Sequence, residues 1–382
     1  MKIARVAIDN HGTIIKQIAF ANYPRKGINT ALSKFLSDRY QSLEAYVPGE
    51  QPSDMKYIKL NTNEAPYPPA PGVVAAVDEN ELKKLFLYPS TDGTSLIKKL
   101  AEFYNVNVEN VIIGNGSDEL LAFAFLAFCD GERSVCFPDI TYGFYPVYAE
   151  LYGIPYTRIP LKDDFTIDPS DYINIGKNIV LANPNAPTGI ALTPDNIEAI
   201  AQSNPDYVVL IDEAYVDFGA QSVIPLTHIY DNILVMHTYS KARSMAGARL
   251  AYAIGPTPLI EDLNRMKYSF NPYNVNRMTQ IAGEAALRED AYYRNMRQEI
   301  IETRAYTEER LRELGFIMTN SLANFVFITH PEIGGHELYA SLKERGILVR
   351  HWNKPRISDY LRITIGTKEQ MDALIAAVRD IL

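Results

Sequence analysis

Three apolar runs of strand length constrain the fold of this chain more than any other feature. Residues 178–182, 207–211 and 233–236 are short, nearly uninterrupted apolar segments rich in valine, isoleucine and leucine. A strand buried on both faces shows such a run, whereas a strand with one solvated face alternates apolar and polar residues. The runs therefore predict interior strands of a sheet that is covered on both faces.

Helical and strand-like segments alternate around these runs. Residues 94–103 and 118–128 show helical periodicity, while residues 111–113, 133–137 and 249–254 are predicted strands. Strands that alternate with helices form parallel or mixed sheets whose faces the helices cover. We therefore expect an α/β fold with a mixed, mostly parallel central sheet flanked by helices.

The pattern changes near residue 285. A long charged amphipathic helix is predicted over 291–314, followed by strands at 324–328 and 360–365 and by a final helix from residue 368. The charges of the long helix indicate a solvated face. These segments predict a second, smaller α+β domain.

We expect three parts along the chain. The large domain covers residues 86–284, and the small domain is discontinuous, made of residues 36–85 and 285–382. Residues 1–35 are expected to form an N-terminal extension of unknown role, either an extra hairpin or an arm. It begins with short strands and continues into a helix at 32–36.

Composition excludes several classes of protein. The chain has 382 residues, of which 47% are hydrophobic, enough for a substantial core, and its formal net charge of -9 argues against nucleic-acid binding. Cys129 and Cys136 stand in neither a CxxC motif nor a histidine cluster, so we expect no disulfide framework and no metal site. Residues 1–20 hold no long apolar stretch, which predicts no signal peptide, no membrane span and a cytoplasmic location.

Four polar or glycine-rich segments follow predicted strands. Ligands of open α/β sheets bind at the carboxyl ends of the strands, so position alone makes these segments candidates for a site. They are Gly114-Asn-Gly-Ser-Asp-Glu, Asn183-Pro-Asn-Ala-Pro-Thr-Gly, Asp212-Glu-Ala-Tyr and the stretch from Thr238 to Arg249.

Each segment has a chemical and a structural interpretation. The glycine segment offers backbone N–H groups to an anion at a helix start, or forms a turn capped by Ser117 or Asp118. The proline-rich loop aims an asparagine amide, or is a rigid turn. Asp212 is a functional carboxylate or a paired core carboxylate. Lys241 follows an apolar run, so it is a nucleophilic amine of lowered pKa or a lysine whose charge reaches solvent.

The order of the segments favours one cofactor. An anion cradle, an asparagine loop, an aspartate at a strand end and Lys241, followed eight positions later by Arg249, supply what pyridoxal phosphate requires. Those requirements are a phosphate anchor, partners for the ring and an amine that forms a Schiff base. The expected cofactor is pyridoxal 5'-phosphate.

From about residue 36 to its C-terminus the chain resembles the fold-type I, pyridoxal-phosphate-dependent aminotransferases of class I/II. Within them it is most similar to the histidinol-phosphate aminotransferase branch. The motifs that carry the resemblance are Tyr46-Val-Pro-Gly, Leu60-Asn-Thr-Asn-Glu-Ala-Pro-Tyr, Tyr88-Pro, Gly114-Asn-Gly-Ser-Asp-Glu, Thr141-Tyr-Gly, Asn183-Pro-Asn-Ala-Pro-Thr-Gly, Asp212-Glu-Ala-Tyr, Ser240-Lys, Ala246-Gly-Ala-Arg, Ala323-Asn-Phe and Leu361-Arg-Ile-Thr-Ile-Gly.

The resemblance implies a role for each matching residue. Lys241 would bind the cofactor as a Schiff base and move the proton at the substrate Cα, and Asp212 would pair with the pyridine nitrogen. Tyr215 and Asn185 would hydrogen-bond the phenolic oxygen of the ring, and Tyr142 would stack on its face. The residues expected around the phosphate are Gly116, Ser117, Asp118, Thr238, Ser240, Arg249 and, from a neighbouring subunit, Tyr88.

Substrate-binding residues and an assembly are implied as well. Arg362 would bind the substrate α-carboxylate, and Asn324 lies in a matching motif beside the substrate. Arg350 would help to bind a substrate phosphate, although a structural arginine remains the alternative. The shared role of Tyr88 implies a homodimer whose partners are small molecules, an amino donor and a 2-oxo acid.

The chain departs from the family pattern at three positions. Ala186 stands where many relatives carry a second asparagine, Ala65 where the branch often has asparagine, and Ala251 where a glycine follows the arginine. The ring contact is therefore assigned to Asn185, and the other two changes are expected to reshape the substrate pocket.

The resemblance implies a ping-pong transaminase, with histidinol phosphate and 2-oxoglutarate as the expected substrates. An aromatic amino-acid aminotransferase or a threonine-phosphate decarboxylase remains the alternative, because both share the cofactor motifs. A regulator without activity is disfavoured, since 35 residues are too few for a DNA-reading module. A dehydrogenase is disfavoured because the segment at Gly114 lacks the third glycine of a dinucleotide fingerprint.

Overall fold

The computed structural model describes residues 7–8, 14–15 and 33–382 of the chain. The chain divides into two units, residues 1–43 and 44–382, and each is considered by itself. In the first unit, strand β1 (Ala7–Ile8) pairs antiparallel with β2 (Ile14–Ile15). A 3-10 helix, η1, covers Asp38–Tyr40.

The helix predicted at 32–36 is wrong for its described part. Residues 34–36 form a turn in which the Leu36 N–H donates to the Ser33 carbonyl at 3.0 Å. The Phe35 N–H donates instead to the Ser33 hydroxyl at 3.2 Å. A serine side chain that bonds nearby backbone competes with helix formation, and an apolar run this short cannot offset that preference.

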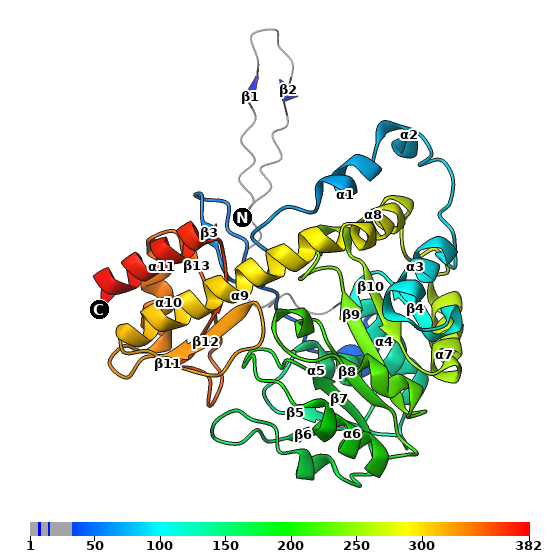
Figure 1. Cartoon of the computed structure of the whole chain (residues 1–382). Helices are drawn as coiled ribbons and strands as arrows, with labels where there is room; N and C mark the ends of the chain where they lie inside the picture. The colour runs from blue at the N-terminus through cyan, green and yellow to red at the C-terminus, as the bar shows by residue number, and fades with distance from the viewer. Residues whose placement is uncertain (1–6, 9–13, 16–32) are drawn as a thin grey trace. The chain divides into compact units, whose positions relative to one another are not determined.

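A seven-stranded sheet lies at the centre of the second unit (Figure 1). The spatial order of its strands is β4-β10-β9-β8-β7-β5-β6, and only β10 runs antiparallel to its neighbours. This arrangement confirms the expected mixed, mostly parallel sheet. The strands are β4 (Val111–Gly114), β5 (Val135–Pro138), β6 (Tyr156–Ile159), β7 (Asn178–Ala182), β8 (Val209–Asp212), β9 (Ile233–Thr238) and β10 (Ala251–Ile254).

Helices cover both faces of this sheet, as the apolar runs predict. Ile179 and Leu181 of β7 belong to one core cluster, while Val180 between them belongs to a second cluster on the other face. One face is covered by α3 (Thr94–Tyr104), α6 (Pro194–Ser203) and α8 (Arg277–Arg288). The opposite face is covered by α4 (Ser117–Phe128), α5 (Phe144–Tyr152) and α7 (Thr257–Phe270).

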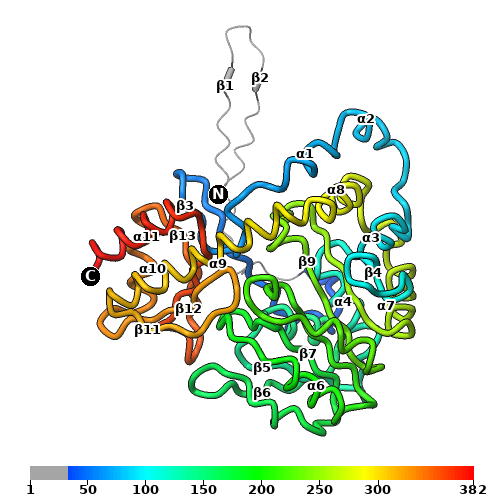
Figure 2. The backbone as a smooth tube through the Cα atoms, viewed as in Figure 1, coloured from blue at the N-terminus to red at the C-terminus, as the bar shows by residue number. Residues whose placement is uncertain are grey.

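A second, antiparallel sheet is built from the C-terminal part of the chain (Figure 2). Its order is β11 (Ile317–Met318), β12 (Phe325–Thr329), β15 (Leu361–Thr364) and β14 (Arg350–His351). Helices α10 (Gly335–Glu344) and α11 (Lys368–Ile381) accompany it. A short parallel pair, β3 (Ile58–Lys59) with β13 (Ile347–Leu348), joins the segment near residue 60 to this part. The domain boundaries stay a prediction.

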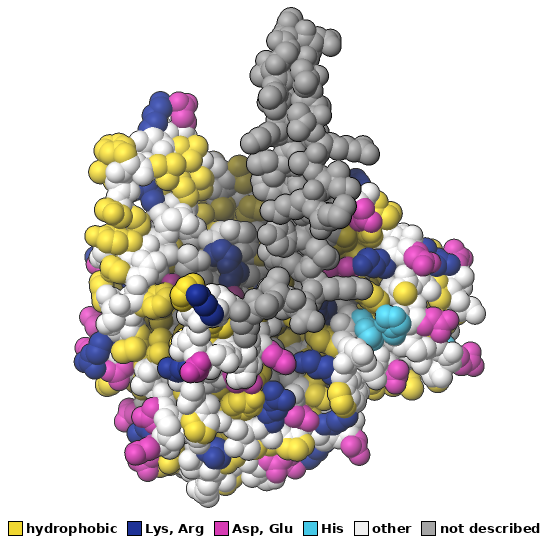
Figure 3. All heavy atoms as spheres, turned by 180° about the vertical axis from the view of Figure 1, so that it is seen from behind, with side chains coloured by type: hydrophobic (Ala, Val, Ile, Leu, Met, Phe, Trp, Pro, Cys, Tyr) yellow, Lys and Arg dark blue, Asp and Glu magenta, His cyan; other side chains and the backbone are white. Residues whose placement is uncertain are grey.

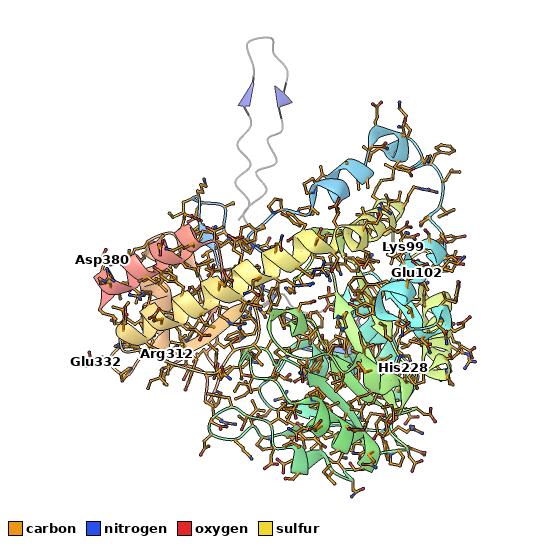
Figure 4. The ribbon with its side chains drawn as sticks, in the orientation of Figure 1. Lys99, Glu102, His228, Arg312, Glu332 and Asp380 are labelled. Carbon is orange, nitrogen blue, oxygen red and sulfur yellow. The ribbon has the colours of Figure 1, made fainter. Side chains whose placement is uncertain are left out.

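The long helix α9 (Asp290–Glu313) connects the two regions, and Arg304 ties it to both. Nη1 of Arg304 donates to the Phe218 carbonyl at 3.0 Å and to the Ala323 carbonyl at 2.5 Å. Arg304 is therefore buried, whereas other charges of the helix face solvent as predicted, such as Arg312 at the periphery in Figure 4.

Two further short helices, α1 (Pro71–Ala76) and α2 (Glu79–Leu82), extend along α8. Among the described residues, no helix combines the length and the apolar character needed to cross a membrane.

The central sheet predicts the cost of one core substitution. Ile179→Ala removes a side chain that is 0% exposed and should lower the free energy of unfolding by about 2–5 kcal/mol. The matched change Ile229→Ala, at a side chain 65% exposed, should cost about 0.5 kcal/mol or less. Urea denaturation measures both, and equal losses would contradict the assignment of β7 to the core.

Candidate active site

The carboxyl ends of three parallel strands meet at one edge of the central sheet. Ala182 of β7 pairs with Asp212 of β8, and Asp212 pairs with Met236 of β9. A cavity of about 330 Å³ opens at this edge. The predicted site residues that line it are Ser117, Asp118, Tyr142, Asp212, Tyr215, Thr238, Ser240, Lys241 and Arg249.

Lys241 lies in the turn that follows β9, with its amine inside the cavity wall. Its Nζ donates to the Thr62 carbonyl at 3.2 Å and lies 5.8 Å from the centre of the Tyr215 ring. Burial, together with the positive charges of Arg362 and Arg249, lowers the pKa of this amine to about 8. A substantial neutral fraction makes the amine a nucleophile near neutral pH.

Asp212 is the last residue of β8, and its side chain is 5% exposed. Its Oδ2 accepts from the Tyr145 hydroxyl at 3.1 Å, and its Oδ1 accepts from the Ala214 N–H at 3.2 Å. Burial raises the pKa of the carboxyl group to about 6, against the opposing effect of these two donors. Both donors are neutral, so the carboxylate has room for a cationic partner in the cavity.

Tyr215 follows β8 and presents its hydroxyl beside Lys241. The Asn63 side-chain amide donates to the Tyr215 hydroxyl oxygen at 2.9 Å. The ring packs edge-on against Phe325 with 5.1 Å between centres. Burial raises the pKa of the phenol, so the hydroxyl keeps its proton at neutral pH.

The start of α4 forms an anion cradle together with the turn before β10. Gly116 has φ +80°, and a Cβ at this position would lie 2.4 Å from Nη2 of Arg249. A side chain at this position would therefore displace the guanidinium from the first turn of the helix, and the positive φ also favours glycine. Nη2 of Arg249 also donates to Asp118 at 2.8 Å, and the Tyr142 hydroxyl donates to the same carboxylate at 2.7 Å.

Two hydroxyls complete the cradle. The Thr238 hydroxyl donates to the Ser240 hydroxyl oxygen at 2.9 Å, and both residues line the cavity. The strand predicted from residue 249 begins two residues later, at Ala251, because Arg249 adopts a left-handed backbone conformation with φ 54°. That conformation ends the turn and directs the arginine to the cradle.

The structure does not bring Asn185 to the cavity. Its Nδ2 donates to the Ile140 carbonyl at 2.9 Å, and its Oδ1 accepts from the Thr141 hydroxyl at 2.7 Å. Ala186 lines the cavity in its place. The loop satisfies the Asn185 amide, which agrees with its interpretation as a rigid turn, and the expected ring contact stays a prediction.

Arg362 lies on β15 and Arg350 on β14 of the second sheet, and Asn324 comes directly before β12. Neither arginine is among the described residues that line the cavity. Nη2 of Arg362 donates to the Asn61 carbonyl at 3.1 Å, while its buried Nε has no hydrogen-bond partner among the described residues. Asn324 donates to the Asn63 carbonyl at 3.1 Å, and its buried Oδ1 is likewise without a partner in that set. Asn324 does not line the cavity.

Arg350 and Tyr88 make contacts outside the cavity. The terminal nitrogens of Arg350 donate to the carbonyls of Val47 and Pro48 at 3.0 and 3.2 Å, a structural role. Its guanidinium also lies 5.3 Å from the Trp352 ring centre, as does that of Arg362. Tyr88 is 77% exposed and lies outside the cavity lining, stacked on Tyr273.

Sequence analysis missed several residues of the site. Thr62 and Glu64 line the cavity, and Asn63 between them holds Tyr215. All three stand in the Leu60-Asn-Thr-Asn-Glu motif, which carried the resemblance without an assigned role. Tyr145, whose hydroxyl donates to Asp212, was missed as well, because no motif marks it.

Comparison with known proteins identifies the family. Residues 55–378 match the model of the aminotransferase class I and II family. The histidinol-phosphate aminotransferase of Brachyspira hyodysenteriae is 49% identical over 92% of this chain and 99% of its own length, and that of Marinomonas sp. is 50% identical over 91% and 99%. The histidinol-phosphate aminotransferase of Sinorhizobium meliloti, solved in complex with pyridoxal-5'-phosphate, superposes with a TM-score of 0.83 at 22% identity, covering 92% of this chain and 100% of that one. The chain therefore belongs to the class I and II aminotransferase family.

Proposed function

We propose that the protein is a pyridoxal-phosphate-dependent aminotransferase that transfers an amino group between histidinol phosphate and 2-oxoglutarate in histidine biosynthesis, by a ping-pong mechanism. One observation carries the proposal: a buried lysine amine of lowered pKa faces a buried carboxylate and an anion cradle in one cavity. Close curated relatives over nine-tenths of the chain support the choice of histidinol phosphate.

The residues of the cavity fit pyridoxal phosphate. The first turn of α4, with Gly116, Ser117, Thr238, Ser240 and Arg249, would hold the phosphate. Asp212, which has only neutral donors, would hold a protonated ring nitrogen, because a buried carboxylate is stabilised by a cation. Lys241 is the amine that would bind the aldehyde carbon.

Pyridoxal phosphate, when bound, supplies a ring that withdraws electrons from the substrate Cα. The residues of the chain contribute binding and proton transfer. Lys241 Nζ is partly neutral near pH 7, so it accepts a proton from a carbon acid beside it and returns it. Asp212 keeps positive charge on the ring side of the cavity. Tyr215, whose hydroxyl retains its proton, would donate a hydrogen bond to an oxygen of the cofactor ring.

Arg362 is the proposed anchor of the substrate carboxylate. Its unpartnered Nε and its planar guanidinium suit a bidentate carboxylate. Arg350 lies on the neighbouring strand, paired with Arg362 in register, and adds positive charge beside Arg362. Two arginines favour an amine substrate that carries an anionic group, either a carboxylate or a phosphate, over one that carries no anionic group.

A homodimer is also proposed. The segment that carries α1 and α2 exposes apolar side chains at neighbouring positions, which gather at the upper left in Figure 3. Exposed apolar patches of this kind mark protein interfaces. The side chains are those of Val74, Leu82, Leu85, Phe86, Leu87 and Tyr88. The cytoplasmic location expected from the composition stays a prediction.

Lys241→Ala should abolish covalent attachment of pyridoxal phosphate and lower turnover at least about a thousand-fold, because the nucleophile is lost. The fold should persist, since removing a buried amine relieves its desolvation cost. Visible absorbance, turnover and the thermal midpoint measure these effects. Lys267→Met, at a buried lysine outside the cavity lining, is the matched control and should retain turnover. Wild-type turnover in Lys241→Ala would overturn the proposal.

Attachment of pyridoxal phosphate to the apoprotein should depend on pH in a defined direction. Lys241 must be neutral to react, and with a pKa of about 8 roughly one molecule in ten is neutral at pH 7. The attachment rate should increase steeply as the pH is raised toward 8 and should level off at higher pH. Stopped-flow absorbance between pH 6 and 10 tests this, with a lysine amide in solution as the reference. A rate still rising between pH 9 and 10 would contradict the lowered pKa.

The substrate is tested by a half-reaction. Protein loaded with pyridoxal phosphate is mixed with histidinol phosphate and separately with phenylalanine, and loss of the visible absorbance is followed. We expect histidinol phosphate to react at least about ten-fold faster, because charge-assisted bonds to its phosphate add binding energy. Faster reaction with phenylalanine would instead indicate an aromatic aminotransferase. Release of carbon dioxide from threonine phosphate would indicate a decarboxylase.

A further inference from the structure

A chain of hydrogen bonds connects Tyr215 to the second sheet through Asn63. The Asn63 N–H donates to the Thr364 hydroxyl oxygen at 2.9 Å, and the Thr364 hydroxyl donates to Asn63 Oδ1 at 3.1 Å. Asn63 Nδ2 then donates to the Tyr215 hydroxyl oxygen at 2.9 Å. Each hydrogen bond uses a different atom of Asn63. Thr364 therefore orients the Asn63 side chain, and the Asn63 side chain in turn holds Tyr215.

This chain has a direction. The Thr364 oxygen accepts from the Asn63 backbone, and its own hydrogen goes to Oδ1, which leaves the amide N–H₂ to face Tyr215. A phenol oxygen that accepts a hydrogen bond still carries one hydrogen of its own. Asn63 is the hydrogen-bond partner of Tyr215 among the described residues, and an amide nitrogen cannot accept. The Tyr215 hydrogen must therefore be donated elsewhere.

The position of Asn63 is rigidly held. Its side chain is 1% exposed, and its backbone is left-handed with φ 56°, a conformation that asparagine tolerates better than most residues. Its carbonyl accepts from Asn324 at 3.1 Å. Thr364 and Arg362 stand two residues apart on β15, so they share a face of the strand. The strand that carries Arg362 thus also orients the Asn63 amide.

Among the described residues that line the cavity, none carries a side-chain amide. Ala186 packs with Tyr215 and Phe325 in a small apolar cluster and contributes only a methyl group. The Asn185 amide is engaged in its own loop. Within the described residues, Asn63 is therefore the group that makes the Tyr215 hydroxyl oxygen an acceptor and leaves its hydrogen to be donated.

We propose that Asn63 is a positioning residue that fixes Tyr215 as a hydrogen-bond donor into the cavity, toward an oxygen anion on the bound cofactor ring. The inference rests on the proposed function. A donor to that oxygen stabilises its anionic form and so lowers the pKa of the neighbouring protonated nitrogen. Reversing the Asn63 bond should remove the donor and raise the pH at which the bound cofactor titrates.

The test is a pH titration of the visible absorbance of the full-length protein loaded with pyridoxal phosphate, without substrate. Asn63→Asp replaces the donor by an acceptor of the same shape, so the Tyr215 hydrogen should turn away from the cavity. The titration midpoint should rise by about one pH unit, the ten-fold change expected for one hydrogen bond. Tyr215→Phe should raise the midpoint similarly, and the double variant should add little to it.

Asn61→Asp is the matched control for added charge. Asn61 is as buried as Asn63 and lies two residues away, but its Nδ2 donates to the Glu50 carbonyl at 2.9 Å rather than to Tyr215. The titration midpoint of Asn61→Asp should stay within about a few tenths of a pH unit of the wild-type value. A shift in Asn63→Asp no larger than that of Asn61→Asp would overturn the inference, and so would a full shift by Asn63→Asp in the Tyr215→Phe background.

A second pair of variants covers the case in which Asn63→Asp does not fold. Thr364→Val removes the hydroxyl that orients the amide and should raise the midpoint, whereas Thr364→Ser keeps the hydroxyl and should restore the wild-type value. Equal midpoints for this pair would overturn the inference. A wild-type protein that gains no visible absorbance from pyridoxal phosphate would overturn the proposed function itself, and the inference with it.

Discussion

A lysine amine held out of water is the constraint on which the rest of the site depends. Burial favours the neutral form of Lys241, and the positive charges of Arg362 and Arg249 act in the same direction. Burial favours the neutral form of Asp212 as well, but for a carboxyl group this raises the pKa instead of lowering it. One cavity therefore keeps an amine and a carboxyl group closer in pKa than they are in water, which prepares both for partners that change charge.

The sheet supplies the geometry for this arrangement. β7, β8 and β9 are parallel neighbours whose carboxyl ends lie at the same edge, so residues far apart in sequence meet there. The second sheet contributes Arg362 from β15, and Asn63 links that strand to Tyr215. The site is thus tied to the second sheet through Asn63, and α9 connects the two regions through Arg304.

The interior strands and most of the cavity residues could be predicted, because burial on both faces leaves an apolar run and the site residues follow those runs directly. Two errors had physical causes that spacing does not show. Arg249 leaves the strand through a left-handed backbone, and Ser33 competes for the backbone of the predicted helix. The ring contact of Asn185 stays a prediction, since its amide is held within its own loop. Asn63 was missed because its role depends on a partner 152 positions away.

The antiparallel course of β10 explains the short spacing between Lys241 and Arg249. A parallel strand after β9 would enter the sheet at the opposite edge and would need a crossover of about a dozen residues or more. Because β10 turns back at once, the chain leaves and re-enters the sheet at the same edge. The short interval between Lys241 and Arg249 thus follows from the antiparallel direction of β10. An insertion in this turn would separate the amine from the anion cradle while leaving both strands intact.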